Sequence, residues 1–256
     1  MAAPSEGSPQ VEVACYVYGV VPASARLPEQ LPGLSPGGQV SLIRTEKIAA
    51  VVEGIPLGRP LGTRAHLMGH ERVLDALVDA GIAIAPMRFG AVLSDEQVVA
   101  DELLTPHEEH FTALLRDLTG RTQYTLTGCY QEESVLREVI AEYPEIRELR
   151  HEISELPAEQ AYHQQVRLGE MIVGVLEQKR RGDGADVLDA LVPYAVDVVV
   201  REPAQADGVV DAAFLIADER REEFDEAVEE CGRQLAGRVR LRLLGPVPAY
   251  DFMPGQ

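Results

Sequence analysis

Residues 209–243 read VVDAAFLIADERREEFDEAVEECGRQLAGRVRLRL, and this run decides the fold of the second half of the chain. It opens with an apolar stretch over residues 209–217 that is typical of a buried strand. Apolar side chains then recur at helical spacing over residues 219–235. Strict alternation of arginine with apolar residues over 238–243 predicts the next strand. A strand, a helix and a strand therefore follow one another directly.

The segments that precede this run extend the same pattern. Residues 122–130 (TQYTLTGCY) predict a strand, residues 132–143 a helix, and residues 194–201 another strand. Together with residues 209–243, the order becomes strand, helix, strand, strand, helix, strand. That order is the ferredoxin-like split βαβ motif.

A helical insertion over about residues 145–192 interrupts this order. Its longest segment carries an apolar stripe at helical spacing, formed by Tyr162, Val166, Gly169, Val173 and Leu176. The sequence RRGDGAD at residues 180–186 predicts a turn, because Gly and Asp favour turn conformations.

The first half of the chain predicts a separate N-terminal α+β domain over residues 1–118. It contains a strand rich in β-branched and aromatic residues at 11–21 (VEVACYVYGVV) and a helix that starts near Thr63. We expect residues 1–10 to be disordered because they are rich in Pro, Ser and Gly. The predicted fold class is therefore α+β with two domains, and residues 119–256 form the ferredoxin-like one with its helical insertion.

The overall composition excludes several classes of function. The 256 residues include 23 Lys and Arg against 42 Asp and Glu, which gives a net charge of −19 and argues against nucleic-acid binding. No apolar run approaches the roughly 20 residues that cross a bilayer, and the start MAAPSEGSPQ lacks the features of a secretion signal. We expect a cytoplasmic protein that contacts neither nucleic acid nor membrane.

No catalytic, cofactor or metal site is predicted with the expected spacing of ligands. His66 and His70 lie four residues apart on one helical face beside Glu71, and a metal-dependent enzyme built on them is one alternative. One packed histidine and one surface histidine on a helix explain the same spacing, and a polar helix face explains His107 and His110. The three cysteines are far apart, which favours neither a disulfide framework nor a zinc site.

Three segments are distinctive when taken together and in order. They are the opening Tyr16-Val17-Tyr18-Gly19-Val20, the stretch 85–92 (APMRFGAV), and the terminal 245–252 (GPVPAYDF). They resemble the gas vesicle protein F/L family, in which the same landmarks read YxYGV, P-x-RFG-T-V and G-P-W-P-P-Y-S-F. The chain departs from these patterns at Ala91, Val247, Ala249 and Asp251, and the choice between F and L stays open.

The resemblance implies two α+β domains, the second ferredoxin-like with a variable helical region. It also implies a non-enzymatic role in building gas vesicles, as an assembly factor or a minor shell component. The implied partners are the small hydrophobic shell protein and other gas vesicle accessory proteins, and the implied location is the cytoplasm, in association with gas vesicles. An acidic partner would keep apolar shell protein dispersed, and an open sheet edge could meet it by strand addition.

Two pairs of residues within these segments are candidates for partner binding. Arg88 and Phe89 follow Pro86 in a predicted edge strand over residues 82–93, and Tyr250 and Phe252 form an aromatic tail. Packing inside the protein is the competing interpretation for both pairs.

A second functional hypothesis is a regulatory protein whose ferredoxin-like domain senses a small ligand. The glycine-containing segments 202–208 (EPAQADG) and 180–186 would then supply backbone donors to that ligand.

Overall fold

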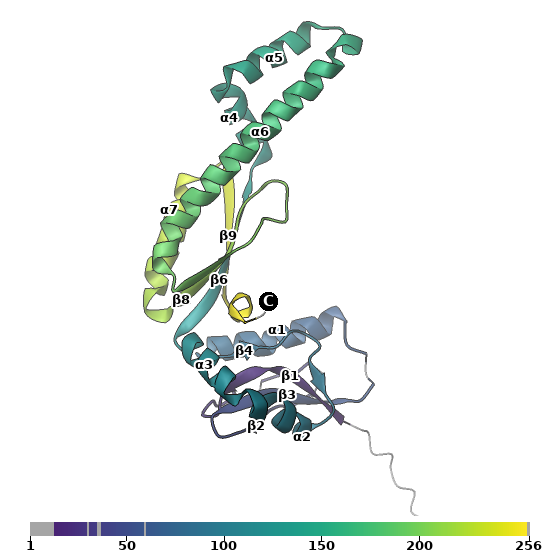
Figure 1. The fold of residues 1–256 in the computed structure, drawn as a ribbon, viewed down its shortest axis with the longest axis vertical. Coiled ribbons are helices and arrows are strands. Elements are labelled where there is room, and N and C mark those ends of the chain that lie inside the picture. Colours follow the sequence, from purple (N-terminus) through teal and green to yellow (C-terminus); the bar gives the residue numbers. More distant parts are fainter. Residues whose placement is uncertain (1–12, 30, 35–36, 59, 255–256) are drawn as a thin grey trace, which may run out of the picture. The chain divides into compact units, whose positions relative to one another are not determined.

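Strand β1 (Val13–Pro22) forms the centre of the first of two compact units in the computed structural model, which describes residues 13–29, 31–34, 37–58 and 60–254. The first unit contains the chain up to Gln123 together with the residues from Pro246 onward, and the second runs from Tyr124 to Gly245. Both units combine helices with a sheet, so the α+β class is confirmed (Figure 1). The expected disorder of residues 1–10 concerns residues outside the described ranges.

The sheet of the first unit is built around β1 because its side chains are buried on both faces. In sheet order the strands are β2 (Val40–Arg44), β3 (Ile48–Pro56), β1 and β4 (Ala85–Pro86), and β5 (Val92–Leu93) also pairs with β1. The β1–β3 pair is antiparallel, and its register shifts between Val17 and Gly19. A Cβ on Gly19 would lie 2.7 Å from the carbonyl oxygen of Ala85, so only glycine lets β4 approach here.

Helices cover both faces of this sheet. On one face, α1 (Arg64–Asp79) packs Val73, Leu74 and Leu77 against the side chains of Tyr16 and Tyr18. On the other face, Val99, Leu104 and Leu115 meet Val17 and Val20 of β1. They belong to a helical run of α2 (Glu96–Val98), the π-helical η1 (Val99–Leu104), the 3-10 turn η2 (Thr105–His107) and α3 (Glu108–Leu118).

The second unit contains the run that opened the sequence analysis. Its sheet has the order β7 (Asp197–Val200), β8 (Gly208–Ala217), β6 (Arg121–Tyr130) and β9 (Val239–Val247). Helices α4 (Glu132–Glu142), α5 (Pro144–Glu155) and α6 (Ala158–Leu191) lie between β6 and β7 in the chain, and α7 (Arg221–Gln234) lies between β8 and β9. Phe214 of β8, Phe224 of α7 and Leu191 of α6 are fully buried in the core between sheet and helices.

The turn predicted at residues 180–186 is wrong, because this segment is helical and belongs to the 34-residue α6. A Cβ on Gly184 would lie 2.6 Å from the backbone carbonyl oxygen of Val209 in β8. The glycine therefore serves close packing of helix on sheet, and not a change of chain direction. The adjacent Asp183 accepts hydrogen bonds from Arg238 and from the hydroxyl of Tyr130, which fasten α6 to the sheet.

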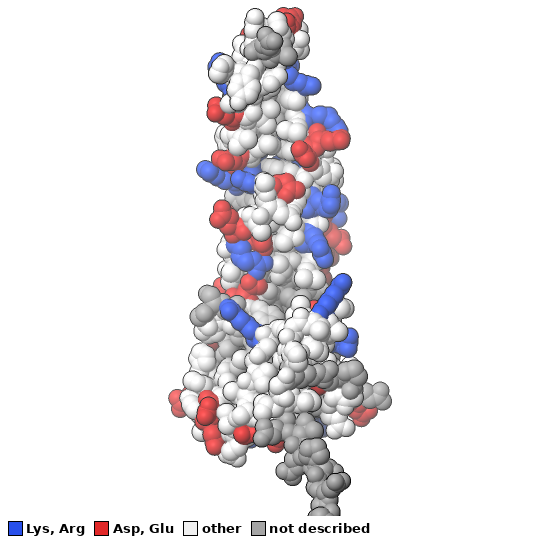
Figure 2. Space-filling view, turned by 90° about the vertical axis from the view of Figure 1, so that its right-hand side faces the viewer, with Lys and Arg blue, Asp and Glu red and all other residues white. Residues whose placement is uncertain are grey.

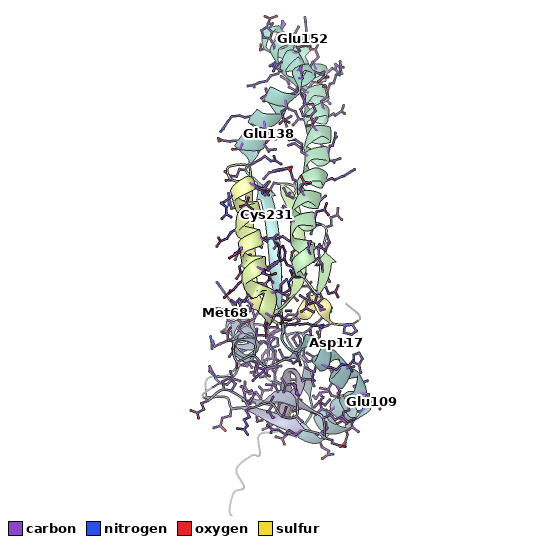
Figure 3. The ribbon with its side chains drawn as sticks, turned by 90° about the vertical axis from the view of Figure 1, so that its left-hand side faces the viewer. Met68, Glu109, Asp117, Glu138, Glu152 and Cys231 are labelled. Carbon is purple, nitrogen blue, oxygen red and sulfur yellow. The ribbon has the colours of Figure 1, made fainter. Side chains whose placement is uncertain are left out.

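Helices α4, α5 and α6 form a helical hairpin in the second unit, drawn in teal and green in Figure 1. The ammonium group of Lys179 on α6 lies 2.7 Å from a carboxylate oxygen of Glu138 and 2.6 Å from one of Glu142, both on α4. Glu138, labelled in Figure 3, also lies 3.7 Å from Arg238. These ion pairs hold α4 against the C-terminal half of α6.

The C-terminal tail was predicted to belong with residues 119–256, but the structure packs it in the first unit. The 3-10 turn η5 (Tyr250–Phe252) follows β9, and the side chain of Tyr250 contacts the core of the first unit. Gln123 donates to Asp251 at 2.5 Å and accepts from the Asp251 backbone amide at 3.1 Å. Apolar periodicity carries no signal for this contact, because the tail holds too few residues to show a period.

Candidate functional site

The three distinctive segments of the sequence meet around the imidazole of His70. Its Nδ1 lies 2.8 Å from the hydroxyl of Tyr16 in β1, and its Nε2 lies 2.8 Å from the hydroxyl of Tyr250 in the tail. Tyr250 also donates to the carbonyl oxygen of Met87, and the amide of Gly90 donates to the Tyr16 hydroxyl. Helix α1 thus presents one histidine that joins the N-terminal strand, the RFG segment and the C-terminal tail.

Ring packing strengthens this arrangement, which we call the aromatic cluster: Tyr16, Tyr18, His70, Phe89 and Tyr250. The His70 ring stacks on Tyr18 with centroids 5.6 Å apart, and it meets Phe89 edge-on at 5.8 Å. Tyr16 and Tyr18 pack edge to face at 5.0 Å. Such pairs contribute about 0.5–1.5 kcal/mol each beyond the burial of their area.

The aromatic cluster is electrically neutral at pH 7. Burial lowers the pKa of His70 to about 4, and it raises the pKa of Tyr16 to about 12. Because the Tyr250 hydroxyl donates to Met87, Nε2 of the neutral imidazole carries the proton and Nδ1 accepts from Tyr16. Both ring nitrogens are therefore used in holding the three segments together.

A buried carboxylate lies beside the aromatic cluster. Glu53 of β3 is fully buried, and its Oε2 accepts a hydrogen bond from the Tyr18 hydroxyl at 2.5 Å and from the Leu34 amide at 2.6 Å. A Cβ on Gly33 would lie 2.0 Å from the same oxygen, so the loop before Leu34 closes directly over the carboxylate. Hydrogen bonding to Glu53 adds to burial in raising the pKa of Tyr18 above its usual range.

Replacing Tyr18 by Phe is expected to lower the free energy of unfolding by about 1.5 kcal/mol, because one donor to a buried carboxylate is lost while the ring packing stays. Urea denaturation of the two proteins measures this difference. Replacing Tyr194, which lies outside the first unit, by Phe is the control. An unchanged midpoint for Tyr18→Phe would show that the hydrogen bond to Glu53 adds nothing to stability.

The predicted partner-binding residues differ in their exposure. Residues 82–93 do not form one strand; they form β4 and β5 on either side of a turn in which Gly90 has φ +96°. This turn leaves Arg88 exposed, whereas Phe89 is half-buried and packs in the aromatic cluster. Tyr250 and Phe252 are also half-buried. Their role in binding a partner stays a prediction.

The two histidines considered as metal ligands, His66 and His70, differ in their hydrogen bonding. Both ring nitrogens of His70 form hydrogen bonds with tyrosine hydroxyls. His66 is buried near the start of α1, and its Nδ1 has no hydrogen-bond partner among the described residues. Across residues 13–254 with their short gaps, no three His, Cys, Asp or Glu side chains gather in a way that could hold a metal ion.

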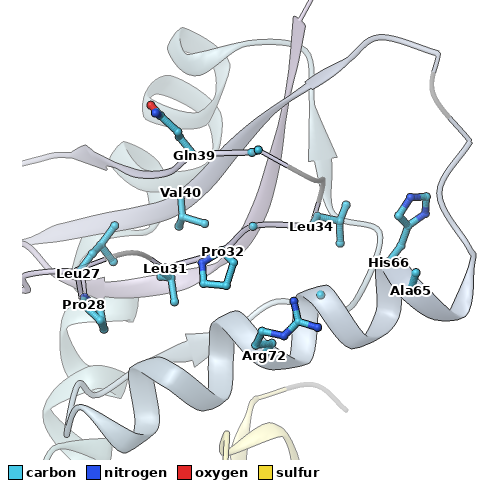
Figure 4. Close-up of a pocket in the computed structure, with 14 residues that line it drawn as sticks. Leu27, Pro28, Leu31, Pro32, Leu34, Gln39, Val40, Ala65, His66 and Arg72 are labelled. Carbon is cyan, nitrogen blue, oxygen red and sulfur yellow. The ribbon is translucent and has the colours of Figure 1, made fainter.

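A hollow of about 940 Å³ opens in the first unit between α1 and the segment that precedes β2 (Figure 4). Its described lining is apolar on one side and carries His66 and Arg72 of α1 on the other. The apolar wall consists of Leu27, Pro28, Leu31, Pro32, Leu34 and Val40. No pattern of the sequence indicated this hollow, because its walls come from segments with no shared periodicity.

Four of the five positions of the apolar stripe predicted on α6 face outward, whereas the fifth, Leu176, is half-buried and packs beside Val135. The exposed fractions are 65% for Tyr162, 45% for Val166 and 56% for Val173. Gly169 lies between them on the same face and meets no other atom within 4 Å of a Cβ position. We call this surface the α6 stripe. On the face that Figure 2 shows, acidic and basic side chains are interspersed with uncharged surface.

No helix in the described ranges is both long and apolar enough to cross a membrane. Helix α6 buries Val187 and Leu191 in the core of the second unit, whereas Tyr162, Val166 and Val173 stay exposed on the α6 stripe. Large apolar side chains gathered on an exposed face are a feature of surfaces that bind other proteins.

Comparison with known proteins gives consistent results over nearly the whole chain. Residues 14–254 match the family described as gas vesicle synthesis protein GvpL/GvpF. The chain is 32% identical over 243 residues to gas vesicle protein F of a Streptomyces species, covering 93% of this chain and 98% of that protein. Gas vesicle protein L1 of Halobacterium salinarum is 28% identical over 205 residues, with 73% of this chain and 70% of that protein covered.

Solved structures show the same fold. The crystal structure of gas vesicle protein GvpF from Anabaena sp. PCC7120 has a TM-score of 0.80 and 24% identity, and covers 94% of this chain and 98% of that one. That of GvpF from Microcystis aeruginosa has a TM-score of 0.74 at 24% identity, with the same coverage. The aromatic cluster thus unites the very segments by which the sequence resembled this group. The chain belongs to the GvpL/GvpF family of gas vesicle synthesis proteins.

Proposed function

We propose that this protein acts in gas vesicle formation as a non-enzymatic assembly factor or minor shell component that binds the small hydrophobic shell protein. Membership of the family supports a role in gas vesicle formation. The observation that carries the binding step is the α6 stripe, in which Tyr162, Val166 and Val173 remain exposed. Association with gas vesicles and with their other accessory proteins is part of the same proposal.

The physical reason is the cost of leaving apolar surface in water. Burying a large apolar side chain gains about 1.5–3 kcal/mol, so a stripe of such residues binds an apolar partner surface without needing precise hydrogen bonds. The high negative charge of the remaining chain keeps the complex dispersed, since like-charged particles repel one another. A soluble carrier for a sticky subunit needs both properties.

We interpret the second unit as a ferredoxin-like domain that carries this helical hairpin. Its elements β6, α4, β7, β8, α7 and β9 follow the order strand, helix, strand, strand, helix, strand, with α5 and most of α6 as the addition. The C-terminal end of α6 packs on the sheet through Val187 and Leu191. In this interpretation the domain is a rigid base that presents the α6 stripe.

Co-expression with the small shell protein tests the binding step. We expect the native protein to keep the shell protein in the supernatant after centrifugation, and the double variant Val166→Asp, Val173→Asp to lose most of it. Gln178→Asp is the matched control, because Gln178 is exposed on another face of the same helix. The binding proposal is refuted if the double variant remains folded by circular dichroism and retains as much shell protein as the native chain.

The four residues proposed earlier for partner binding can be tested in the same assay. Arg88 is exposed, so Arg88→Glu changes the surface without disturbing the core. Phe89 and Tyr250 contribute to the aromatic cluster, so we propose that they act by holding Arg88 and the tail segment of Phe252 in place. Loss of retention in Arg88→Glu supports a second contact besides the α6 stripe.

The alternative of a ligand-sensing ferredoxin-like domain loses one of its two predicted loops. Residues 180–186 lie inside α6, where backbone amides are used in the helix. In the other segment, residues 202–207 lie outside helices and strands, and Gly208 begins β8. Nothing in the geometry of this stretch favours the alternative over binding of the shell protein.

A further inference from the structure

A second feature of the helical hairpin lies where α4 and α6 approach the sheet. There a pocket of about 600 Å³ opens between the two helices and the segment that precedes β8. Its walls are the apolar side chains of Val135 and Leu136 on α4 and of Val173 and Leu176 on α6. We call it the hairpin pocket. Its volume falls in the range of cavities that hold a few apolar side chains or a small ligand.

The hairpin pocket continues the α6 stripe. Val173 belongs to both, and Leu176 follows it by three residues on the same side of the helix. From Tyr162 to Val173 the stripe spans about 16 Å at the helical rise of 1.5 Å per residue, which is three helical turns. An apolar ridge of matching length on a partner helix can therefore lie along α6 and end in the pocket.

The mouth of the pocket carries excess negative charge. Glu132, Glu177 and Asp207 belong to the pocket lining and are exposed, and Arg180 is the basic residue of the described lining. Arg180 donates a hydrogen bond to the carbonyl oxygen of Ala206 at 2.9 Å, which fixes it at one side. Among these carboxylates, Glu177 alone has a basic neighbour within ion-pair distance in the described residues, Arg181 at 4.0 Å.

The side chain of Tyr130, which lines the hairpin pocket, is fixed by hydrogen bonding within the second unit. Its hydroxyl donates to Asp183, which also pairs with Arg238. Burial raises the pKa of Tyr130 to about 12, so this group is neutral at physiological pH. The carboxylates that remain available to a partner are therefore those at the mouth.

From this juxtaposition we propose that the hairpin pocket binds the end of an amphipathic helix of the partner, whose apolar ridge lies on the α6 stripe and whose lysine or arginine meets Glu132 and Asp207. This inference rests on the proposed function and adds to it a rule of selectivity. A helix with an acidic residue at that end is repelled by the mouth, and one without an apolar ridge gains nothing from Val173 and Leu136.

Two fluorescent peptides test the rule with the full chain. Each is a helix of about 20 residues with the same leucine ridge, and they differ in carrying either lysines or glutamates at one end. Fluorescence anisotropy measures their affinities for the native protein. We expect the lysine peptide to bind at least about tenfold more tightly than the glutamate peptide, and this difference to shrink as salt is raised.

Two variants locate the effect. Glu132→Gln with Asp207→Asn is expected to weaken the lysine peptide about fivefold to tenfold and to leave the glutamate peptide no weaker. Glu222→Gln with Glu226→Gln on the exposed face of α7 makes the same change in net charge, and is expected to leave both affinities unchanged. Val173→Asp is expected to abolish binding of both peptides.

Equal affinity for the two peptides overturns the proposal, as does an equal loss in the α7 control or no saturable binding up to about 100 μM. Self-association of the native chain that disappears in Val173→Asp would assign the pocket to a second copy and overturn it as well. The peptides replace the shell protein, so the outcomes are separable. If co-expression succeeds while the peptides show no charge preference, the function stands and the selectivity rule falls.

Discussion

Lowering the pH from 7 to 4 is expected to remove about 3 kcal/mol of unfolding free energy through His70 alone. In the folded protein, burial lowers the pKa of this imidazole to about 4, against an unfolded value of 6.5. Between these values the unfolded chain binds a proton that the folded chain does not bind. Stability therefore falls as the pH falls through this window and changes little with His70 above it.

Urea denaturation at a series of pH values measures this slope, and its comparison with His70→Gln isolates the histidine. The variant is expected to be less stable at pH 7 and to show a smaller loss between pH 6.5 and 4. The imidazole resonances in a proton NMR titration report the same pKa directly. A His70 that titrates near its ordinary value in the folded protein would contradict the burial described for the aromatic cluster.

The parts of the fold that the sequence predicts well are those with a clear period. The helix expected at residues 219–235 is α7 (Arg221–Gln234), and the strand expected at 122–130 is β6 (Arg121–Tyr130). In α7 one face is buried and the other exposed, and in β6 buried residues alternate with half-buried ones from Tyr124 onward, so the pattern of apolar residues reflects the structure. Within the alternating segment 238–243, the residues from Val239 onward likewise lie in β9, with Arg240 and Arg242 exposed.

Contacts between segments that are distant in the chain are harder to predict from the sequence than helices and strands. His70 and Tyr250 are 180 residues apart, and only the resemblance to a family placed their segments together in one argument. The sequence proposes Tyr250 as part of an aromatic tail that binds a partner, and it gives no sign that the Tyr250 hydroxyl contacts the imidazole of His70. A hydrogen bond of this kind requires only one residue in each segment, so it produces no periodic pattern in the sequence.

The α6 stripe shows a different limit. Apolar spacing predicted an amphipathic helix correctly, but the same spacing is produced by a helix that packs inside its own chain and by one that packs on another protein. The exposure of Tyr162 and Val173 shows that this part of the helix is not covered by the described chain, and exposure is a property of the fold. The sequence motifs therefore predict partner residues in the first unit and the tail, whereas the more exposed apolar surface lies in the helical insertion.

Gly184→Ala is expected to lower the free energy of unfolding of the second unit by about 2–3 kcal/mol. The new Cβ would lie 2.6 Å from the backbone carbonyl oxygen of Val209. Because neither atom belongs to a flexible side chain, the clash is relieved only if α6 moves away from the sheet. Such a shift also strains the bonds of the adjacent Asp183 to Arg238 and Tyr130. Thermal and urea denaturation followed by circular dichroism measure the loss.

Gly182→Ala provides the matched control, because it lies two residues away on the same helix and a Cβ there meets nothing within 4 Å. Alanine is the better helix former by about 1 kcal/mol, so this variant is expected to be more stable than the native chain. The two substitutions are chemically identical and have opposite expected signs. If both variants gain stability, the glycines of RRGDGAD are only poor helix formers, and the close approach of α6 to β8 imposes no requirement on residue 184.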